Sequence, residues 1–211
     1  MKIICIARNY SDHAAEMGAP QFPRGSREAV SPAFFLKPDS ALLIKDRPFY
    51  YPDFSSQVEY EVELVVRIDR LGKSIEERFA HRYYSSVALG IDFTARDLQR
   101  EAKSKGLPWT LSKGFDGSAL VSDFLSLANL GGDVQRLSFS LQRNGHEVQR
   151  GNTAEMLCSV DRMIAYVSQF MQLRTGDLFF TGTPSGVGAV EIGDVLAGWL
   201  EGRQMFECKV K

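Results

Sequence analysis

Two glutamates stand one residue apart in a segment that otherwise has the composition of a buried β-strand. The segment runs from Val58 to Val66 and carries Glu61 and Glu63 among apolar residues. Alternate side chains of a strand share a face, so the two carboxylates are predicted to point the same way. Like charges side by side in an apolar strand are costly unless a cation neutralises them. The pair therefore indicates either a cation-binding site within a sheet or the solvated face of an edge strand.

A third acidic residue has similar surroundings. Asp92 follows the apolar segment Val87–Ile91, and few cysteines or histidines lie near any of the three acids. A site formed by Glu61, Glu63 and Asp92 would offer oxygen ligands only. Such sites suit hard ions such as Mg²⁺, Mn²⁺ or Ca²⁺ rather than zinc.

Length and composition set limits on the fold and on possible partners. The 211 residues show no internal repeat and no linker, so we expect one domain over residues 1–211. A formal net charge of −1 gives no attraction to nucleic acid or to an anionic membrane. No apolar stretch approaches the roughly 20 residues of a membrane span. We therefore expect neither nucleic acid nor membrane among the partners.

The cysteines and the N-terminus favour a cytoplasmic protein. The chain opens directly on an apolar strand-like segment, Met1–Ala7, without the features of a signal or transit peptide. Cys5, Cys158 and Cys208 are odd in number and widely spaced, which argues against disulfides and zinc clusters. All three are expected to be packed in the core of a protein from a reducing compartment.

The pattern of secondary structure predicts an α+β fold that is mostly β. Alternation around Asn144-Gly145 predicts a hairpin over residues 137–149. Helices are expected at 75–84, after Asp92 as far as Gly106, and within 153–173, where the apolar residues recur on one face. The remaining expected elements are a short strand or extended piece at 33–38 and strands throughout the region up to 69 and at 177–181, 195–200 and 205–210.

The N-terminal region after the first strand is expected to form a lid, at about residues 9–32. Asn9 is placed to cap a short helix that Gly18 and Pro20 end, and a loop rich in Pro and Gly follows. His13 and Glu16 are three residues apart and would share a face of that helix. They form either a dyad in which the carboxylate orients the imidazole, or an ordinary solvated pair.

Other candidates are ambiguous on pattern alone. Lys113 has apolar neighbours, but a surface lysine would look the same, and Arg8 and Lys37 are similar single candidates. Arg96 could pair structurally with its neighbour Asp97. The glycine-rich segment 181–188 lacks a P-loop ending and indicates either a turn or an anion-binding backbone nest.

Taken together, these segments match a known family. The motifs are, in chain order, Arg8-Asn9-Tyr10-x-x-His13, Phe35-Leu36-Lys37-Pro38, Glu61-x-Glu63-Leu64, Asp92-Phe93-Thr94-Ala95-Arg96-Asp97, Leu107-Pro108-Trp109-Thr110, Asn152-Thr153, and Gly176-Asp177 leading into Thr181-Gly182-Thr183-Pro184-x-Gly186-Val187-Gly188. In this set and order the chain resembles the fumarylacetoacetate hydrolase (FAH) family. Within that family it is similar to the short acylpyruvase and oxaloacetate decarboxylase members.

The resemblance implies a fold and a set of site residues. It implies a mixed β-roll or sandwich core of the family's C-terminal domain type, with a few helices, a short lid helix and a homodimeric assembly. By the same match, Glu61, Glu63 and Asp92 would hold Mg²⁺ or Mn²⁺. The catalytic residues would be His13, Glu16 and Lys113, and the substrate-binding residues Gln99 and Thr183.

The resemblance also implies a metal-dependent enzyme acting on a small 2-oxo acid. We expect hydrolysis of a carbon–carbon bond in 3-acylpyruvates through a metal-stabilised enolate, and decarboxylation of oxaloacetate through the same enolate. Two alternatives stay open. One is an isomerase or decarboxylase of 2-hydroxyhepta-2,4-diene-1,7-dioate from aromatic catabolism, and the other is a metal-bound protein that has lost catalysis.

Overall fold

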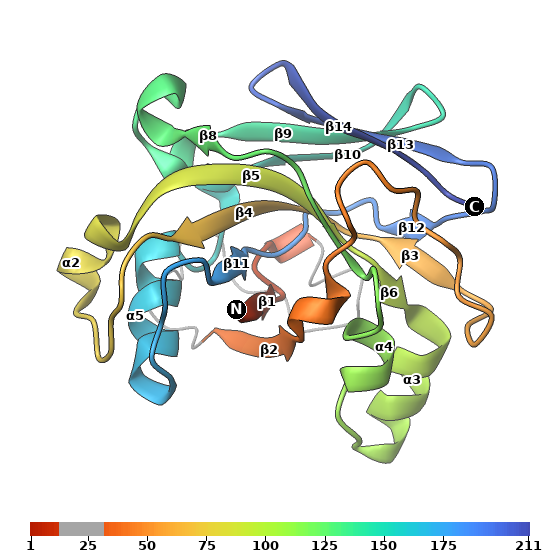
Figure 1. Cartoon of the computed structure of the whole chain (residues 1–211), viewed down its shortest axis with the longest axis horizontal. Coiled ribbons are helices and arrows are strands. Elements are labelled where there is room, and N and C mark those ends of the chain that lie inside the picture. Colours follow the sequence, from red (N-terminus) through yellow and green to blue (C-terminus); the bar gives the residue numbers. More distant parts are fainter. Residues whose placement is uncertain (13–31) are drawn as a thin grey trace.

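Strands dominate the computed structural model, which describes residues 1–12 and 32–211 (Figure 1). The largest sheet has seven strands in the order β2-β1-β11-β4-β5-β7, with β8 also paired to β5. All of its pairs are antiparallel except β1 with β11. Its strands are β1 (Ile3–Ala7), β2 (Ala33–Lys37), β4 (Val62–Ile68), β5 (Tyr84–Asp92), β7 (Ala119–Val121), β8 (Leu125–Ser126) and β11 (Leu178–Phe180).

Two smaller sheets accompany it. Four strands in the order β10-β9-β13-β14 lie across the long strands β4 and β5, in the upper part of Figure 1. Three short strands in the order β12-β3-β6 flank the end of β4 and β5. The strands of these sheets are β3 (Val58–Tyr60), β6 (Thr94–Ala95), β9 (Ser138–Arg143), β10 (His146–Asn152), β12 (Gly188–Ala189), β13 (Val195–Leu200) and β14 (Arg203–Lys209).

Within residues 32–211 the helices are few and short. They are α2 (Glu77–Ala80), α3 (Arg96–Lys105), α4 (Thr110–Lys113) and α5 (Val160–Phe170), with 3₁₀ turns η1 (Asp39–Ala41), η2 (His81–Tyr83), η3 (Leu127–Leu130), η4 (Val134–Arg136) and η5 (Thr153–Glu155). Gly106 ends α3 at a φ of 65°, a left-handed conformation that glycine adopts without strain. Within the part of the chain that the structure describes, no helix is long and apolar enough to span a membrane.

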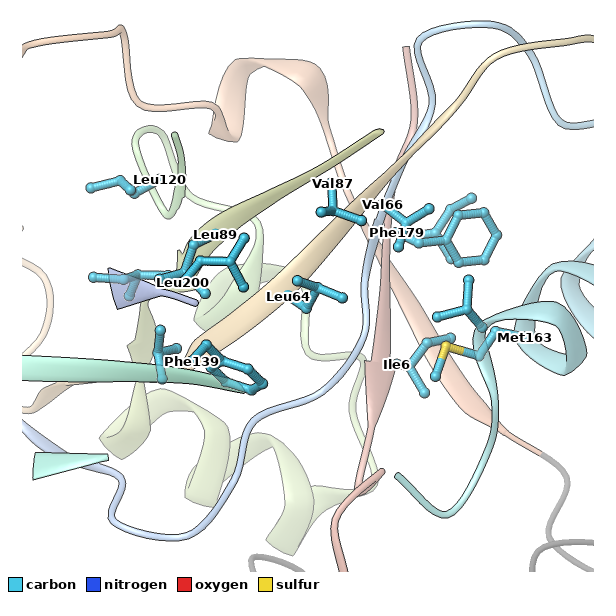
Figure 2. Packing of buried hydrophobic residues seen from close by; sticks show 14 of the residues in the cluster. Ile6, Leu64, Val66, Val87, Leu89, Leu120, Phe139, Met163, Phe179 and Leu200 are labelled. Atoms are coloured by element: carbon cyan, nitrogen blue, oxygen red, sulfur yellow. The ribbon is translucent and has the colours of Figure 1, made fainter. Parts of the chain in front are cut away.

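The central strands divide their side chains between two faces. One face of β4 and β5 carries large side chains such as Leu64, Val66 and Leu89, which pack in the main core with Phe139 and Met163 (Figure 2). The other face carries a smaller apolar cluster, which includes Ile3, Cys5, Val65, Ala88 and Phe180. Because strand side chains alternate, Glu61, Glu63 and Val65 belong to this second face, as do Ala88, Gly90 and Asp92.

Gly90 shows how closely the second face is packed. A Cβ at this position would lie 2.6 Å from the carbonyl oxygen of Leu120 and 2.8 Å from a methyl carbon of Val65. Gly90 also pairs with Glu63 across the β4–β5 ladder. A larger residue here would displace the strands that position the acids.

The structure confirms the predicted α+β, mostly β fold and corrects several details. The Asn144-Gly145 hairpin is confirmed, with both residues at positive φ. The predicted helix over 75–84 contains only α2 and a 3₁₀ turn, and the one within 153–173 begins at Val160. Residues 38–57 contain a 3₁₀ turn rather than continuous strand. The lid prediction, with His13 and Glu16, lies largely outside the described residues.

Asn9 has a different role from the helix cap that the sequence indicates. Its amide nitrogen donates to the carbonyl oxygens of Thr181 (2.8 Å) and Cys158 (3.2 Å), and its Oδ1 accepts from the Cys158 backbone N–H (2.8 Å). The side chain therefore ties the end of β1 to the segments before α5 and after β11. All three cysteines are buried and free, as predicted.

Replacement of Asn9 by Ala should destabilise the fold markedly. Three buried hydrogen bonds would be lost and their backbone partners left unsatisfied, so we expect the free energy of unfolding to fall by about 2–4 kcal/mol. Denaturant unfolding measures this loss. Asn152→Ala is the matched control, because Asn152 bonds to Ser138 and Ala154 at a more exposed place. Equal losses in the two variants would contradict the structural role of Asn9.

Candidate active site

The three acids that the sequence singles out lie together at one end of the β4–β5 pair. Glu61 links β3 to β4, Glu63 lies in β4, and Asp92 is the last residue of β5. The backbone N–H of Asp92 donates to the Glu61 carbonyl at 2.9 Å. One carboxylate oxygen from each residue lies within 4.8 Å of the others, and the residues are only 5%, 2% and 1% exposed. The solvated edge strand, the alternative that the pattern left open, is wrong.

A buried glutamine explains why the strand is interrupted at Glu61. The Gln149 side chain accepts from the backbone N–H of Val62 (2.9 Å) and donates to Thr183 Oγ1 (2.9 Å) and the Pro184 carbonyl (3.0 Å). The Thr183 hydroxyl donates in turn to the Val62 carbonyl at 2.9 Å. Val62 thus bonds to side chains at the point where β3 gives way to β4, and the glycine-rich segment is held against it.

The glycine-rich segment also contributes directly to the acidic group. The backbone N–H of Gly182 donates to Glu63 Oε2 at 2.6 Å. Gly182 has a φ of 98°, and a Cβ there would lie 2.7 Å from the Cβ of Asn9. The sequence left open whether this segment is a turn or an anion-binding backbone nest. The structure shows that its Gly182 N–H donates to an anionic group, which is a carboxylate of the protein itself.

Lys113 lies at the centre of the site. The alternative that the sequence left open, a surface lysine, is wrong. Its ammonium nitrogen is 2.7 Å from Glu61 Oε2, 2.7 Å from Asp92 Oδ2 and 2.5 Å from the Thr94 hydroxyl. The residue is 3% exposed. Burial alone would lower the pKa of Lys113, but the carboxylates of Asp92 and Glu61 outweigh this effect and raise that pKa above its ordinary value.

Lys37 supports Asp92 from the opposite side. Its ammonium nitrogen lies 2.7 Å from Asp92 Oδ1. It also donates to the carbonyl of Lys113 and to Ser118 Oγ (3.0 Å) and O (3.1 Å). The residue is 1% exposed, so its charge is stabilised by these partners rather than by water.

Arg96 organises the other side of the acidic group. Its guanidinium lies 2.5 Å from Glu59 Oε2 and 2.5 Å from Glu61 Oε1, and donates to Gln99 Oε1 at 2.5 Å. Arg96 therefore pairs with the strand acids and not with its neighbour Asp97. The Asp97 carboxylate instead accepts from Ser55 and Ser56, which fixes the start of α3.

Glu63 is the acid with the least cationic compensation. Among residues 1–12 and 32–211, no cationic side chain forms an ion pair with it. Burial raises the pKa of the Glu63 carboxyl well above its ordinary range, and the nearby charges of Asp92 and Glu61 raise it further. A further cation beside the three acids would remove this cost.

The residues present fit a divalent metal ion. The donor set consists of carboxylate oxygens, which hard ions prefer. The Lys113 ammonium bridging Glu61 and Asp92 shows that a positive charge is favourable between the carboxylates. Glu61, Glu63 and Asp92 could therefore hold an ion such as Mg²⁺ or Mn²⁺.

These residues line a single pocket together with two of the predicted substrate contacts. The lining comprises Ile6, Ala7, Arg8, Phe35, Glu61, Glu63, Asp92, Arg96, Gln99, Lys103, Trp109, Lys113 and Thr183. The structure thus brings Lys113, Gln99 and Thr183 to the acids. His13 and Glu16 are outside the described residues, so the dyad remains a prediction.

Sequence reasoning missed the roles of Lys37, Arg96 and Gln149. Lys37 and Arg96 stood among single candidates without an assigned role, although each lies in a motif of the family resemblance. The sequence did contain a signal for a buried role. Lys37 lies at the end of an apolar strand-like segment, and Arg96 comes shortly after another. Gln149 lay within the predicted hairpin, where nothing in its local pattern indicates a contact with Val62, which is 87 residues away along the chain.

Comparison with known proteins decides the family. The family model described as fumarylacetoacetate (FAA) hydrolase C-terminal matches residues 2–211. The chain belongs to the fumarylacetoacetate hydrolase family. It is accordingly an FAH-family enzyme, and the resemblance that the motifs indicated is confirmed.

Relatives in this family have several activities. The mitochondrial oxaloacetate tautomerase FAHD1 of Rattus norvegicus is 39% identical over 209 residues, covering 99% of this chain and 91% of that protein. The oxaloacetate tautomerase YcgM of Escherichia coli is 35% identical, covering 97% and 90%. The crystal structure of fumarylpyruvate hydrolase from Pseudomonas aeruginosa, in complex with Mn²⁺ and pyruvate, is 35% identical, with a TM-score of 0.90 and coverage of 100% and 89%.

Replacement of Lys37 by Met should destabilise the metal-free protein strongly. Asp92 would lose one of its two cationic partners while remaining buried, so we expect a loss of about 3–5 kcal/mol in the free energy of unfolding. Lys45→Met is the matched control, since Lys45 also lies 2.7 Å from an aspartate, Asp123, but both side chains are exposed. The control should unfold almost as the parent does, because exposed ion pairs contribute little. Coincident denaturation curves for Lys37→Met and the parent would refute the importance of this buried pair.

Proposed function

We propose that this chain is a divalent-metal-dependent enzyme that forms the enolate of small 2-oxo acids carrying a second carbonyl group at C4. The first reaction that we propose is the tautomerisation of oxaloacetate. The observation that carries the proposal is the buried group of Glu61, Glu63 and Asp92 with Lys113 at its centre. Support also comes from the relatives that are oxaloacetate tautomerases and from a Dictyostelium discoideum oxaloacetate decarboxylase, 39% identical over 196 residues.

In this proposal the three acids hold Mg²⁺ or Mn²⁺. When bound, the ion supplies a Lewis acid for the keto oxygen of the substrate and for the negative charge of the enolate. Burial of the site strengthens these electrostatic interactions because little water is present to screen them.

The chain's own cations complete the site. Lys113 places an ammonium group where negative charge develops, and Thr94 and the two acids fix its position. Arg96 holds Glu61 through one nitrogen and Gln99 through another, so that the amide of Gln99 is presented to the substrate in a fixed orientation. Lys37 performs the same positioning for Asp92.

Hydrolytic cleavage of 3-acylpyruvates is the second candidate reaction. It needs an activated water to attack the distal carbonyl, after which the carbon–carbon bond breaks and its electron pair leaves with pyruvate as an enolate, which the same site would stabilise. His13, oriented by Glu16, would remove the proton from that water. The fumarylpyruvate hydrolase of Pseudomonas aeruginosa favours this candidate, because its structure contains pyruvate, the product that such cleavage releases.

Isomerisation of an unsaturated hydroxy diacid is the remaining alternative. A structure of 2-hydroxyhepta-2,4-diene-1,7-dioate isomerase from Mycobacterium marinum is 30% identical, with a TM-score of 0.82 and coverage of 99% of this chain and 73% of that chain. This reaction moves a proton and needs no attacking water. Loss of all activity on oxaloacetate and acylpyruvates would direct testing to this substrate.

Removal of the metal should abolish oxaloacetate tautomerisation. Dialysis against a chelator should eliminate the spectrophotometric keto–enol conversion, and added Mg²⁺ or Mn²⁺ should restore it. Glu63→Gln should raise the metal concentration that gives half-maximal activity by about 100-fold or more, since even indirect ligand supports are worth about 10–100-fold. Glu101→Gln, an exposed acid on α3, is the control and should titrate as the parent does. Full activity in chelator would disprove a metal-dependent reaction.

Replacement of His13 by Ala should separate the hydrolysis of acylpyruvates from the decarboxylation of oxaloacetate. Loss of a general base should slow acetylpyruvate hydrolysis by about 10²–10⁴-fold. Part of the oxaloacetate decarboxylation should persist, because that reaction needs no attacking water. Rates on both substrates would be compared at saturating Mg²⁺, with His146→Ala as the control for an exposed histidine. Undiminished hydrolysis in His13→Ala would remove the dyad from the mechanism.

A further inference from the structure

Two cationic side chains in the pocket differ from the three that pair with the acids. Arg8 directly follows β1, and Lys103 lies in the last turn of α3. Both line the same pocket as Glu61 and Asp92. Both are exposed, unlike Lys113, so they lie at the outer part of the pocket.

Neither side chain has an anionic partner in the described ranges 1–12 and 32–211. No hydrogen bond or ion pair connects the Arg8 or Lys103 head group to a residue there. The Lys103 nitrogen lies 5.4 Å from the ring centroid of Trp109, another pocket residue, and this contact holds it over the indole. The outer cations are therefore available to a ligand.

The charges around Lys103 disfavour its protonated form. Partial burial lowers the pKa of Lys103, and the positive charges of Arg96, Arg8 and Lys113 lower it further. The inner cations are compensated by direct ion pairs with the strand acids, whereas Lys103 forms no ion pair with a described residue, and the charge of Glu61 offsets the repulsion only in part. A bound anion would supply that compensation.

The backbone at Arg8 is also unusual. Its φ is 59°, in the left-handed region, where a residue with a Cβ is strained. Asn9, the next residue, is anchored by its three buried hydrogen bonds. The guanidinium is thus carried by a backbone fixed at the pocket.

We propose that Arg8 and Lys103 bind the carboxylate at the end of the substrate remote from the 2-oxo group. The preferred substrates are then 2-oxo dicarboxylates of the oxaloacetate type rather than acylpyruvates with an uncharged end. This inference rests on the proposed function, because it takes the 2-oxo end of the substrate to lie at the three acids. It assigns a separate part of the pocket to the choice of substrate.

Steady-state kinetics on two substrates tests the assignment. Oxaloacetate carries the remote carboxylate and acetylpyruvate carries a methyl ketone in its place. Arg8→Gln and Lys103→Gln should each raise KM for oxaloacetate about tenfold or more, the scale of one charged hydrogen bond, and leave KM for acetylpyruvate within about twofold. Lys103→Arg should retain most of the affinity for oxaloacetate.

Lys105→Gln is the matched control for the loss of one positive charge on α3. Lys105 pairs with Glu101 on the exposed side of the helix and does not line the pocket. Its KM for both substrates should equal that of the parent. Thermal unfolding of all variants excludes loss of folded protein as the cause of any change.

Two kinetic results would overturn the inference. An equal rise in KM for both substrates would place the two cations at the carboxylate that the substrates share. An unchanged KM for oxaloacetate in both variants and in their combination would show that the cations do not contact substrate.

A binding measurement separates this inference from the proposed function. Calorimetric titration of the Mn²⁺-loaded protein with oxaloacetate and with pyruvate needs no turnover. Tighter binding of oxaloacetate, lost in Arg8→Gln and Lys103→Gln, would support the subsite even if the parent catalysed neither reaction. Equal affinities for the two acids in the parent would overturn the subsite, whatever the activity.

Discussion

The contact on which the site depends is the buried ammonium of Lys113 between Glu61 and Asp92. A buried carboxylate or ammonium alone is costly, and here each is compensated by the other. Lys37 from β2 and Arg96 from α3 extend the same compensation to the remaining oxygens. Elements distant in sequence must therefore reach one point, which fixes how β2, α3 and α4 lie against the central strands.

The division of the strands into two faces makes this convergence possible. The larger core occupies one face of β4 and β5, so the opposite face can carry the acids. Small residues on that face, such as Ala88 and Gly90, let the neighbouring strands and the β7 backbone approach closely. The stability of the fold and the chemistry of the site thus use opposite faces of the same strands.

Local patterns in the sequence predicted the acids and the hairpin well. A period of two residues places Glu61 and Glu63 on one face, and Asn144-Gly145 determines its own turn. Contacts between distant segments could not be predicted in this way: Lys37 meets Asp92, which lies 55 positions further along the chain, and no local pattern records that pairing. The helix within 153–173 is shorter than its apolar spacing indicates, because that spacing begins before α5, in the 3₁₀ turn η5 and the extended residues that follow it, where tertiary contacts override helix propensity.

The overall charge of −1 conceals a strong separation of charge within one pocket. The inner part and the residues directly behind it hold four carboxyl groups, those of Glu59, Glu61, Glu63 and Asp92, against three buried cations. The outer part carries Arg8 and Lys103, whose head groups form no ion pair with any described residue. A divalent cation bound at the inner part and a substrate carboxylate bound at the outer part would together relieve both imbalances. In the net charge these opposite charges cancel almost to zero, so only the arrangement of the side chains in space can show them.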